Sequence, residues 1–224
     1  MHIYNISKKE IRNLKRVGSG EEAIVYEFNN NQLLKLYHSY KKISAGKIIM
    51  LSSMQHKIKN TKLPLGPVYD QYDIIGCMHY YHKNAINFDD LIDIEDQTYK
   101  IDKFRQLNNN IDELLTNNIY FYDLDNQNVL ITPNHKVELI DTDSANISND
   151  KGNKLSIYRQ LKSMILETLF NQEYYLNDEE ILSGYDVNYK YIDDFTANNL
   201  SPELFNEFFD YLEKDKVLIK KREV

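Results

Sequence analysis

Two short apolar runs around a turn constrain this chain more than any other feature. Residues 129–132 (Val-Leu-Ile-Thr) and 137–140 (Val-Glu-Leu-Ile) flank a Pro-Asn turn at 133–134. Apolar runs bounded by turn residues predict a β-hairpin. That hairpin would bring Asn128, just before the first strand, close to Asp141, just after the second. An amide and a carboxylate are both oxygen ligands that magnesium accepts.

A second acid completes this group. Asp123 lies five positions before Asn128, so the segment has the spacing D-x-x-x-x-N, followed by Asp141. An acid, an amide and a second acid in this order suit a metal-nucleotide phosphotransfer site. We expect Asp123 to take a proton from a substrate hydroxyl. Asn128 and Asp141 are the predicted magnesium ligands.

A glycine turn and a lysine precede these residues. Gly18 and Gly20 flank Ser19, and Lys35 lies in the apolar run 33–36. Glycines permit tight turns whose backbone N–H groups approach phosphate oxygens. A Gly-Ser-Gly segment alone is also typical of a plain hairpin turn. A strand lysine behind the turn would reach the α- and β-phosphates, so the prediction depends on both features together.

The order of glycine turn, strand lysine, acid, amide and trailing acid resembles the protein-kinase superfamily. The resemblance covers residues 17–170 and is greatest to small, minimal bacterial kinase-like proteins, some of which are injected into host cells. It implies a bilobal α+β fold, with a small antiparallel β-sheet N-lobe over residues 1–80. A mostly helical, reduced C-lobe would follow over residues 81–224. It also implies ATP and Mg²⁺ as ligands.

The resemblance assigns roles to further residues. Val25 matches the residue that covers adenine, and Lys35 matches the strand lysine. Residues 76–81 match the strand that enters the hinge, with Met78 as gatekeeper and the following backbone against adenine. The implied nucleotide-binding set is Gly18, Ser19, Gly20, Val25, Lys35, Met78, His79, Tyr80 and Tyr81.

Apolar periodicity predicts helices in the second part of the chain. The spacing of apolar residues over 101–115 and over 157–169 is that of helices facing a core. The second of these resembles the buried helix beneath a kinase active site. Ser201 and Pro202 predict another helix start, with a serine N-cap and proline in the first turn. Its apolar stripe is expected to be core: Leu204, Phe205, Phe208, Phe209 and Leu212.

Composition excludes several classes of protein. No run of 18 apolar residues occurs, which excludes a transmembrane helix, and the first residues lack a signal peptide's apolar core. A net charge of −7 argues against a nucleic-acid partner. Cys77, the single cysteine, is expected to be buried and inert, and no zinc cluster is predicted. These features indicate a cytoplasmic protein, and the resemblance to injected kinase-like proteins implies a translocated bacterial effector as an alternative.

One departure from the kinase pattern concerns the helix after Lys35. No Asp or Glu occurs between Glu27 and Asp70, so the helix acid that pairs with the strand lysine in the family is missing. Lys47 takes its place, and two ammonium groups close together would repel. We expect Lys35 to pair with Asp141, or Glu21 or Glu22 to fold in, or the helix to swing outward. The predicted inward face is Ile43, Met50, Leu51, Met54 and Ile58.

The segment after Asp141 is another departure. Only residues 142–155 separate it from the next long helix, which is too short for a peptide-binding shelf. The pair 121–122 is Phe-Tyr where many kinases carry His-Arg, so a phosphorylated loop would have no receiving arginine. We infer an enzyme that is always on, or one assembled by an activating partner protein.

Two further acids leave alternatives open. Asp125 stands where protein Ser/Thr kinases place a lysine, and its carboxylate would repel the transferred phosphate unless metal or a cationic substrate compensates. It is equally consistent with a turn acid facing solvent. Asp143 suits either a second metal ligand or a capping acid.

The sequence thus predicts an ATP-dependent phosphotransferase, with a protein Ser or Thr as the favoured acceptor and docking partly outside the cleft. One alternative is a pseudokinase scaffold that binds nucleotide without catalysis. The other is a kinase for a small molecule such as an aminoglycoside or choline, which the missing shelf and Asp125 would suit.

Overall fold

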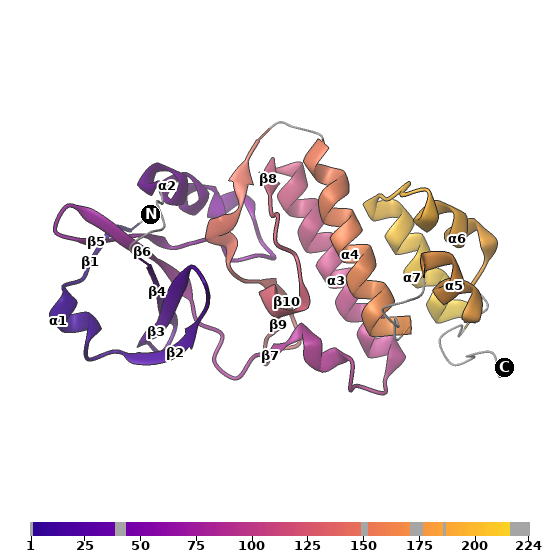
Figure 1. Cartoon of the computed structure of the whole chain (residues 1–224), viewed down its shortest axis with the longest axis horizontal. Coiled ribbons are helices and arrows are strands. Elements are labelled where there is room, and N and C mark those ends of the chain that lie inside the picture. The colour runs from indigo at the N-terminus through magenta and orange to yellow at the C-terminus, as the bar shows by residue number, and fades with distance from the viewer. Residues whose placement is uncertain (1, 39–43, 149–151, 171–176, 186, 216–224) are drawn as a thin grey trace.

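The chain folds into a sheet followed by helices. The computed structural model describes residues 2–38, 44–148, 152–170, 177–185 and 187–215. A sheet lies at one end of the elongated molecule, a small hairpin region in the middle, and packed helices at the other end (Figure 1). The architecture is α+β: a six-stranded, mostly antiparallel sheet, then a largely helical region. None of the described helices is long and apolar enough to cross a membrane.

The six-stranded sheet has the spatial order β1-β5-β6-β4-β3-β2. β1 pairs with β5 in parallel, and the other neighbours are antiparallel. The predicted antiparallel sheet is thus found as a mostly antiparallel one, and at one edge the N-terminal residues add a short parallel strand. The strands are Tyr4–Asn5 (β1), Lys15–Ser19 (β2), Ala23–Asn29 (β3), Gln32–Tyr37 (β4), Gly66–Asp70 (β5) and Asp73–Tyr80 (β6).

The two faces of this sheet bury different residues. Successive strand residues point to opposite faces, so Leu34 and Met78, which are register partners, lie on one face together. There they pack with Val68 and with Ile6 and Ile11 of the N-terminal segment. The residues of β4 and β6 that alternate with these two point to the opposite face of the sheet.

Two helices accompany the sheet, where the sequence predicted one. The additional helix is α1 (Lys8–Ile11), a single turn with a capping box between Ser7 and Glu10. The predicted one is α2 (Ala45–Met54), capped by Ser44 and continued by the 3-10 turn η1 (Gln55–Lys57).

The inward face of α2 differs from the predicted one. Ile48 and Leu51 are fully buried, whereas Met50 is 45% exposed. The helix starts at Ala45, and its rotation turns Ile48 rather than Met50 toward the core. Of the other predicted positions, Ile58 is buried and Met54 packs against the core. Ile43 lies outside the described residues.

The predicted hairpin is confirmed. β9 (Val129–Ile131) and β10 (Val137–Leu139) pair antiparallel, and β7 (Ile86–Asn87) pairs with β9 as a third strand. Short turns flank the hairpin and carry the polar residues of the site. They are η2 (Phe88–Leu91), η3 (Asn126–Asn128) and η4 (Thr142–Ser144), with the strand pair β8 (Ile119–Tyr120) and β11 (Asn146–Ile147) nearby.

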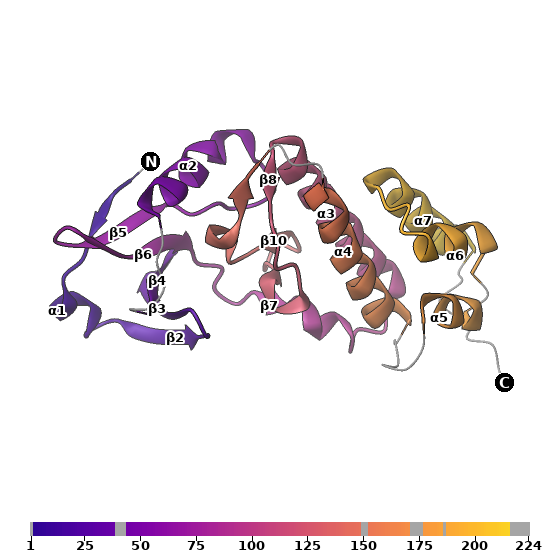
Figure 2. The ribbon, with the colours of Figure 1, turned by 45° about the horizontal axis from the view of Figure 1, so that its top comes forward.

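The helical region contains the larger core. α3 packs against both α4 and α7, and α5 packs against α6 (Figure 1, Figure 2). The three helices predicted from periodicity are confirmed, and all five residues of the last helix's apolar stripe are buried. The helices are α3 (Gln97–Thr116), α4 (Gly152–Phe170), α5 (Asp178–Gly184), α6 (Tyr189–Thr196) and α7 (Pro202–Asp215).

Candidate active site

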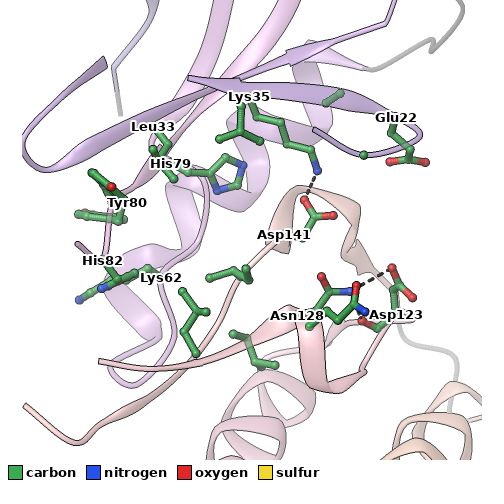
Figure 3. A pocket seen from close by; sticks show the side chains of 18 of the residues that line it. Glu22, Leu33, Lys35, Lys62, His79, Tyr80, His82, Asp123, Asn128 and Asp141 are labelled. Atoms are coloured by element: carbon green, nitrogen blue, oxygen red, sulfur yellow. Dashed lines mark hydrogen bonds and ion pairs between the residues drawn. The ribbon is translucent and has the colours of Figure 1, made fainter. Parts of the chain in front are cut away.

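A cavity of about 650 Å³ is lined by both the six-stranded sheet and the β9–β10 hairpin (Figure 3). Its volume is in the range of cavities that bind cofactors and small molecules. It is also where most of the predicted site residues meet. Those that line it are Gly20, Val25, Lys35, His79, Tyr80, Tyr81, Asp123, Asn128 and Asp141.

The turn after Asp123 fixes the orientation of that acid. Asn128 donates through Nδ2 to the carbonyl oxygen of Asp123 at 2.9 Å and to its carboxylate Oδ2 at 3.1 Å. Asp125 caps the same turn, because its Oδ1 accepts the backbone N–H groups of Gln127 at 2.8 Å and Asn128 at 2.9 Å. Asp125 is therefore an exposed turn acid, the second of its two predicted interpretations, although it also lines the cavity.

The hairpin brings the two predicted metal ligands to one edge. The N–H of Ile140 donates to the carbonyl oxygen of Asn128 at 2.9 Å, which ties the end of β10 to the start of β9. Asp141 follows in the left-handed region, with φ of 61° and ψ of 27°. Non-glycine residues with positive φ are uncommon and cluster at functional sites. Here the conformation turns the chain into η4 beside the cavity.

Lys35 reaches across the cavity from β4 to the segment that follows the hairpin. Its Nζ forms an ion pair with Asp141, as expected from the sequence, and a second one with Asp143 Oδ1 at 3.1 Å. The side chain of Lys35 is 9% exposed, that of Asp141 is 32% exposed and that of Asp143 is 2% exposed. Lys35 thus joins one acid that faces the cavity and one that is buried behind it.

Asp143 is the centre of a buried polar cluster, which sequence reasoning missed. Its Oδ1 lies 3.3 Å from His79 Nε2, and its Oδ2 accepts the Tyr37 hydroxyl at 2.5 Å. Burial alone would raise the pKa of the Asp143 carboxyl, but His79, Lys35 and Tyr37 together hold it well below its usual value. The same burial raises the pKa of Tyr37, so its hydroxyl stays protonated and donates.

Cys77 belongs to this cluster and is fully buried, as the sequence predicted. Its sulfur lies 3.0 Å from His79 Nε2 and 2.9 Å from the Tyr37 hydroxyl. Burial and then the charge of Asp143 raise the pKa of this thiol well above its usual value. Ligand atoms of Cys77, His79 and Asp143 all lie within 4.8 Å of one another, a grouping that the sequence did not suggest.

The glycine segment is only partly at the cavity. Gly18 and Ser19 belong to β2, where Gly18 pairs with Val25, and they do not line the cavity. Gly20 does line it and begins the turn to β3, with its N–H donating to Ala23 O at 2.9 Å. None of the described glycines has a positive φ, so the turn does not depend on a left-handed glycine.

The apolar part of the cavity is formed by both sides of the cleft. Val25 and Leu33 contribute from the sheet, and Leu130 and Leu139 from the hairpin. The residues after β6 continue the wall, and His82 Nε2 lies 3.0 Å from Glu138 Oε2. An apolar slot beside charged groups suits a ligand with a flat apolar part and an anionic part.

Met78 does not take the predicted gatekeeper position. It is fully buried on the opposite face of the sheet, because its strand partner is Leu34 and paired residues share a face. The neighbouring His79 pairs with Leu33 and points into the cavity instead (Figure 3). Neighbouring residues of a strand point to opposite faces of the sheet, so a difference of one position decides which residue reaches the cavity. The comparison with the kinase hinge did not determine which face each residue takes.

No protein-family model matches this chain, and no curated protein matches it. Any assignment of function therefore rests on the residues of the cavity themselves.

Proposed function

We propose that the cavity binds ATP with magnesium and that the chain is a phosphotransferase with a protein-kinase-like fold. The single observation that carries this proposal is the convergence of four polar residues, distant in sequence, on one cavity: Lys35, Asp123, Asn128 and Asp141. Lys35 comes from strand β4, and the other three come from the segments just before and just after the hairpin. Lysine, amide and acids of this kind are the groups that hold and transfer a phosphoryl group.

The donor set fits a divalent cation. Asn128 uses Nδ2 for both of its hydrogen bonds to Asp123, so the amide oxygen is the atom that would ligate a cation. The carboxylate of Asp141, a third exposed, supplies the second oxygen. Oxygen ligands of this kind suit Mg²⁺. When bound, the ion would neutralise charge on the phosphate oxygens.

Lys35 has a different role. Its ammonium pairs with Asp141 and Asp143 in the structure, and the same donor would hold the α- and β-phosphates. The apolar slot between Val25, Leu33 and Leu139 is suited to the adenine ring. The turn at Gly20 lies over the phosphate end, and no atom lies within 4 Å of a Cβ built at that position.

Asp123 is the proposed base. Its side chain is exposed, and Asn128 holds its Oδ2 at 3.1 Å, which sets the direction of the carboxylate. A hydroxyl placed beside it would be oriented for in-line attack and would lose its proton to it. Positioning and charge neutralisation would contribute most of the rate enhancement.

The favoured acceptor is a Ser or Thr hydroxyl of a protein. In support, the described residues between Asp141 and α4, which begins at Gly152, are 142–148, and they contain the turn η4 and the two-residue strand β11. A segment this short offers little surface for an extended peptide, so the protein substrate would dock partly outside the cleft.

A small cationic acceptor is the second candidate, favoured by an adjoining cavity. This cavity, of about 320 Å³, shares Asp125 and Gln127 with the first and is also lined by Asp89 and Glu167. Three acids lining one cavity would attract an amine or a guanidinium group.

Asp123→Ala tests the proposed function. The purified chain should bind Mg-ATP and transfer label from γ-labelled ATP to a substrate protein or to itself. Asp123→Ala should abolish transfer and leave Mg-ATP affinity within about twofold, because the residue meets the acceptor and not the nucleotide. Asp193→Ala, an exposed acid on α6, is the matched control. Absence of Mg-ATP binding by the unaltered chain contradicts the proposal. Binding without any transfer by the unaltered chain indicates the scaffold alternative.

A further inference from the structure

Lys35 and Lys47 both contact the turn between Asp141 and Ser144, but in different ways. Lys35 binds the carboxylates of Asp141 and Asp143. Lys47, on α2, donates through Nζ to the backbone carbonyl oxygen of Ser144 at 2.9 Å. The repulsion between the two ammonium groups that the sequence suggested is thus offset, because each has an acceptor of its own on the turn.

The support for Lys35 comes from the turn and from the sheet rather than from α2. Lys35 and Cys77 are register partners on β4 and β6, and Tyr37 lies two residues along the same face. Asp143, on the turn η4, contacts the Tyr37 hydroxyl and His79 on this face of the sheet. The carboxylate is therefore fixed on one side by sheet residues and presents Oδ1 to the lysine.

We propose that Asp143 replaces the missing acid of α2 as the buried anchor of Lys35, so that this lysine is positioned independently of α2. The proposal rests on the proposed function, since Lys35 is placed there to hold phosphates. Asp143 is a positioning residue in this scheme: it contacts Lys35, whereas Asp141 is exposed enough to exchange the lysine for a cation.

The burial of the two acids explains why they have separate tasks. Asp141 is a third exposed and lines the cavity, so its pairing with Lys35 can be exchanged for a cation. Asp143 is 2% exposed and is already surrounded by donors. Lys35 would then keep one fixed partner when a nucleotide enters, and its ammonium would move little. A site anchored in this way needs no rotation of a helix to assemble.

Chemical labelling tests the anchor without any nucleotide. An ion pair with a buried carboxylate holds the lysine side chain in one place, so loss of this partner leaves the amine freer to meet an acylating reagent. Asp143→Asn should therefore raise the rate of Lys35 acetylation by acetic anhydride severalfold, as measured by peptide mass spectrometry on the folded chain. Lys47→Gln, the matched control on α2, should leave the Lys35 rate unchanged. An unchanged rate in Asp143→Asn, or an equal rise in Lys47→Gln, overturns the proposal.

A double-mutant comparison separates positioning from folding. Asp143→Asn should weaken Mg-ATP binding by about tenfold in the unaltered background and by less than about twofold in a Lys35→Met background. Equal losses in both backgrounds would mean that Asp143 acts on the fold or on the ligand directly, and would overturn the proposal. Tyr37→Phe, which removes one donor to Asp143, should give a smaller loss in the same direction. If the unaltered chain binds no Mg-ATP, the proposed function fails, while the labelling result still decides the anchor.

Zinc titration examines the competing role of the same residues. The ligand atoms of Cys77, His79 and Asp143 are close enough for a metal, but the Lys35 ammonium lies 3.1 Å from Asp143 Oδ1 and would repel a divalent cation. We expect no stoichiometric zinc uptake by the folded chain. Uptake of one zinc per chain that is lost in Cys77→Ser would make Asp143 a metal ligand and overturn its role as the lysine anchor.

Discussion

Gln160 Nε2 on α4 donates a hydrogen bond to the carbonyl oxygen of Tyr122 at 2.8 Å, one residue before the proposed base. The amide oxygen of Gln160 accepts the N–H of Leu124 at 3.2 Å, one residue after it. The helix therefore holds the backbone on both sides of Asp123. Gln160→Ala should reduce the free energy of unfolding by about 1–3 kcal/mol, because two backbone groups lose their partner. It should also lower phosphotransfer at unchanged Mg-ATP affinity.

Urea denaturation and a transfer assay measure these two effects. Ser163→Ala is the control, since this exposed residue lies on the same helix and bonds only to its own helix at Arg159 O. If Gln160→Ala lowers stability but leaves transfer intact, the helix supports the fold without setting the position of Asp123.

Much of the fold could be predicted from apolar periodicity. Helices with long apolar stripes, such as α3 and α7, and the hairpin around its Pro-Asn turn were predicted because local patterns determine them. The parallel pairing of β1 and the rotation of α2 were not predicted. Both depend on contacts between segments distant in sequence, here Tyr4 with Val68 and Ile48 with the core.

The site residues could be predicted where a sequence motif determines their positions. They could not be predicted where the register between two strands determines which side chains meet. Asp123, Asn128 and Asp141 flank a local hairpin, and the structure brings them together. The buried cluster depends instead on the register of β4 and β6, which pairs Lys35 with Cys77 and Leu33 with His79. An alternating-face reading of the two strands would have suggested this grouping, but only after the register was known. The role of Asp143 required the turn η4 as well.

Asp141→Ala should remove the dependence of nucleotide binding on magnesium. The variant loses the more exposed of the two acids beside Lys35, so a cation would keep only the amide of Asn128 as a protein ligand. In a thermal shift assay, ATP should stabilise the unaltered chain more with magnesium than without it, and the two values should coincide in Asp141→Ala. A retained magnesium effect would place the metal ligands elsewhere. Asp193→Ala again serves as control.

The thiol of Cys77 should be unreactive in the folded chain. It is fully buried, and burial followed by the charge of Asp143 raises its pKa, so little of the reactive thiolate forms. An aromatic disulfide reagent at pH 8 should react with this thiol at least about a hundredfold more slowly in the folded chain than in 8 M urea. In urea, one thiol per chain should react, because the sequence has one cysteine. Rapid reaction without denaturant would show that the cluster around Asp143 opens readily.

Stability should fall in acid partly because of Asp143. His79, Lys35 and Tyr37 outweigh burial and depress its folded-state pKa, whereas an unfolded aspartate has a pKa of about 3.9. A depressed pKa stabilises the folded state at pH values above about 4, and this contribution is lost as the pH falls from there toward the folded-state pKa.

The free energy of unfolding measured from pH 6 to pH 3 checks this contribution. The unaltered chain should lose about 1 kcal/mol more than Asp143→Asn does over that range. Asp193→Asn, with the same chemical change at an exposed site, should follow the unaltered chain. Parallel curves for the unaltered chain and Asp143→Asn would mean that the carboxyl is not held in its charged form by its neighbours.

Gly76→Ala should disturb the strand that carries Lys35. A Cβ at this position would lie 2.1 Å from the carbonyl oxygen of Lys35, because β6 and β4 approach each other closely there. Backbone cannot yield as a flexible side chain would, so the sheet must shift. The expected loss is about 1–3 kcal/mol in the free energy of unfolding, with weaker Mg-ATP binding. Gly20→Ala is the matched control, since a Cβ there meets no atom within 4 Å, and its stability should change by less than about 1 kcal/mol. Equal stabilities for the two variants would mean that β4 and β6 are not held at this spacing in solution.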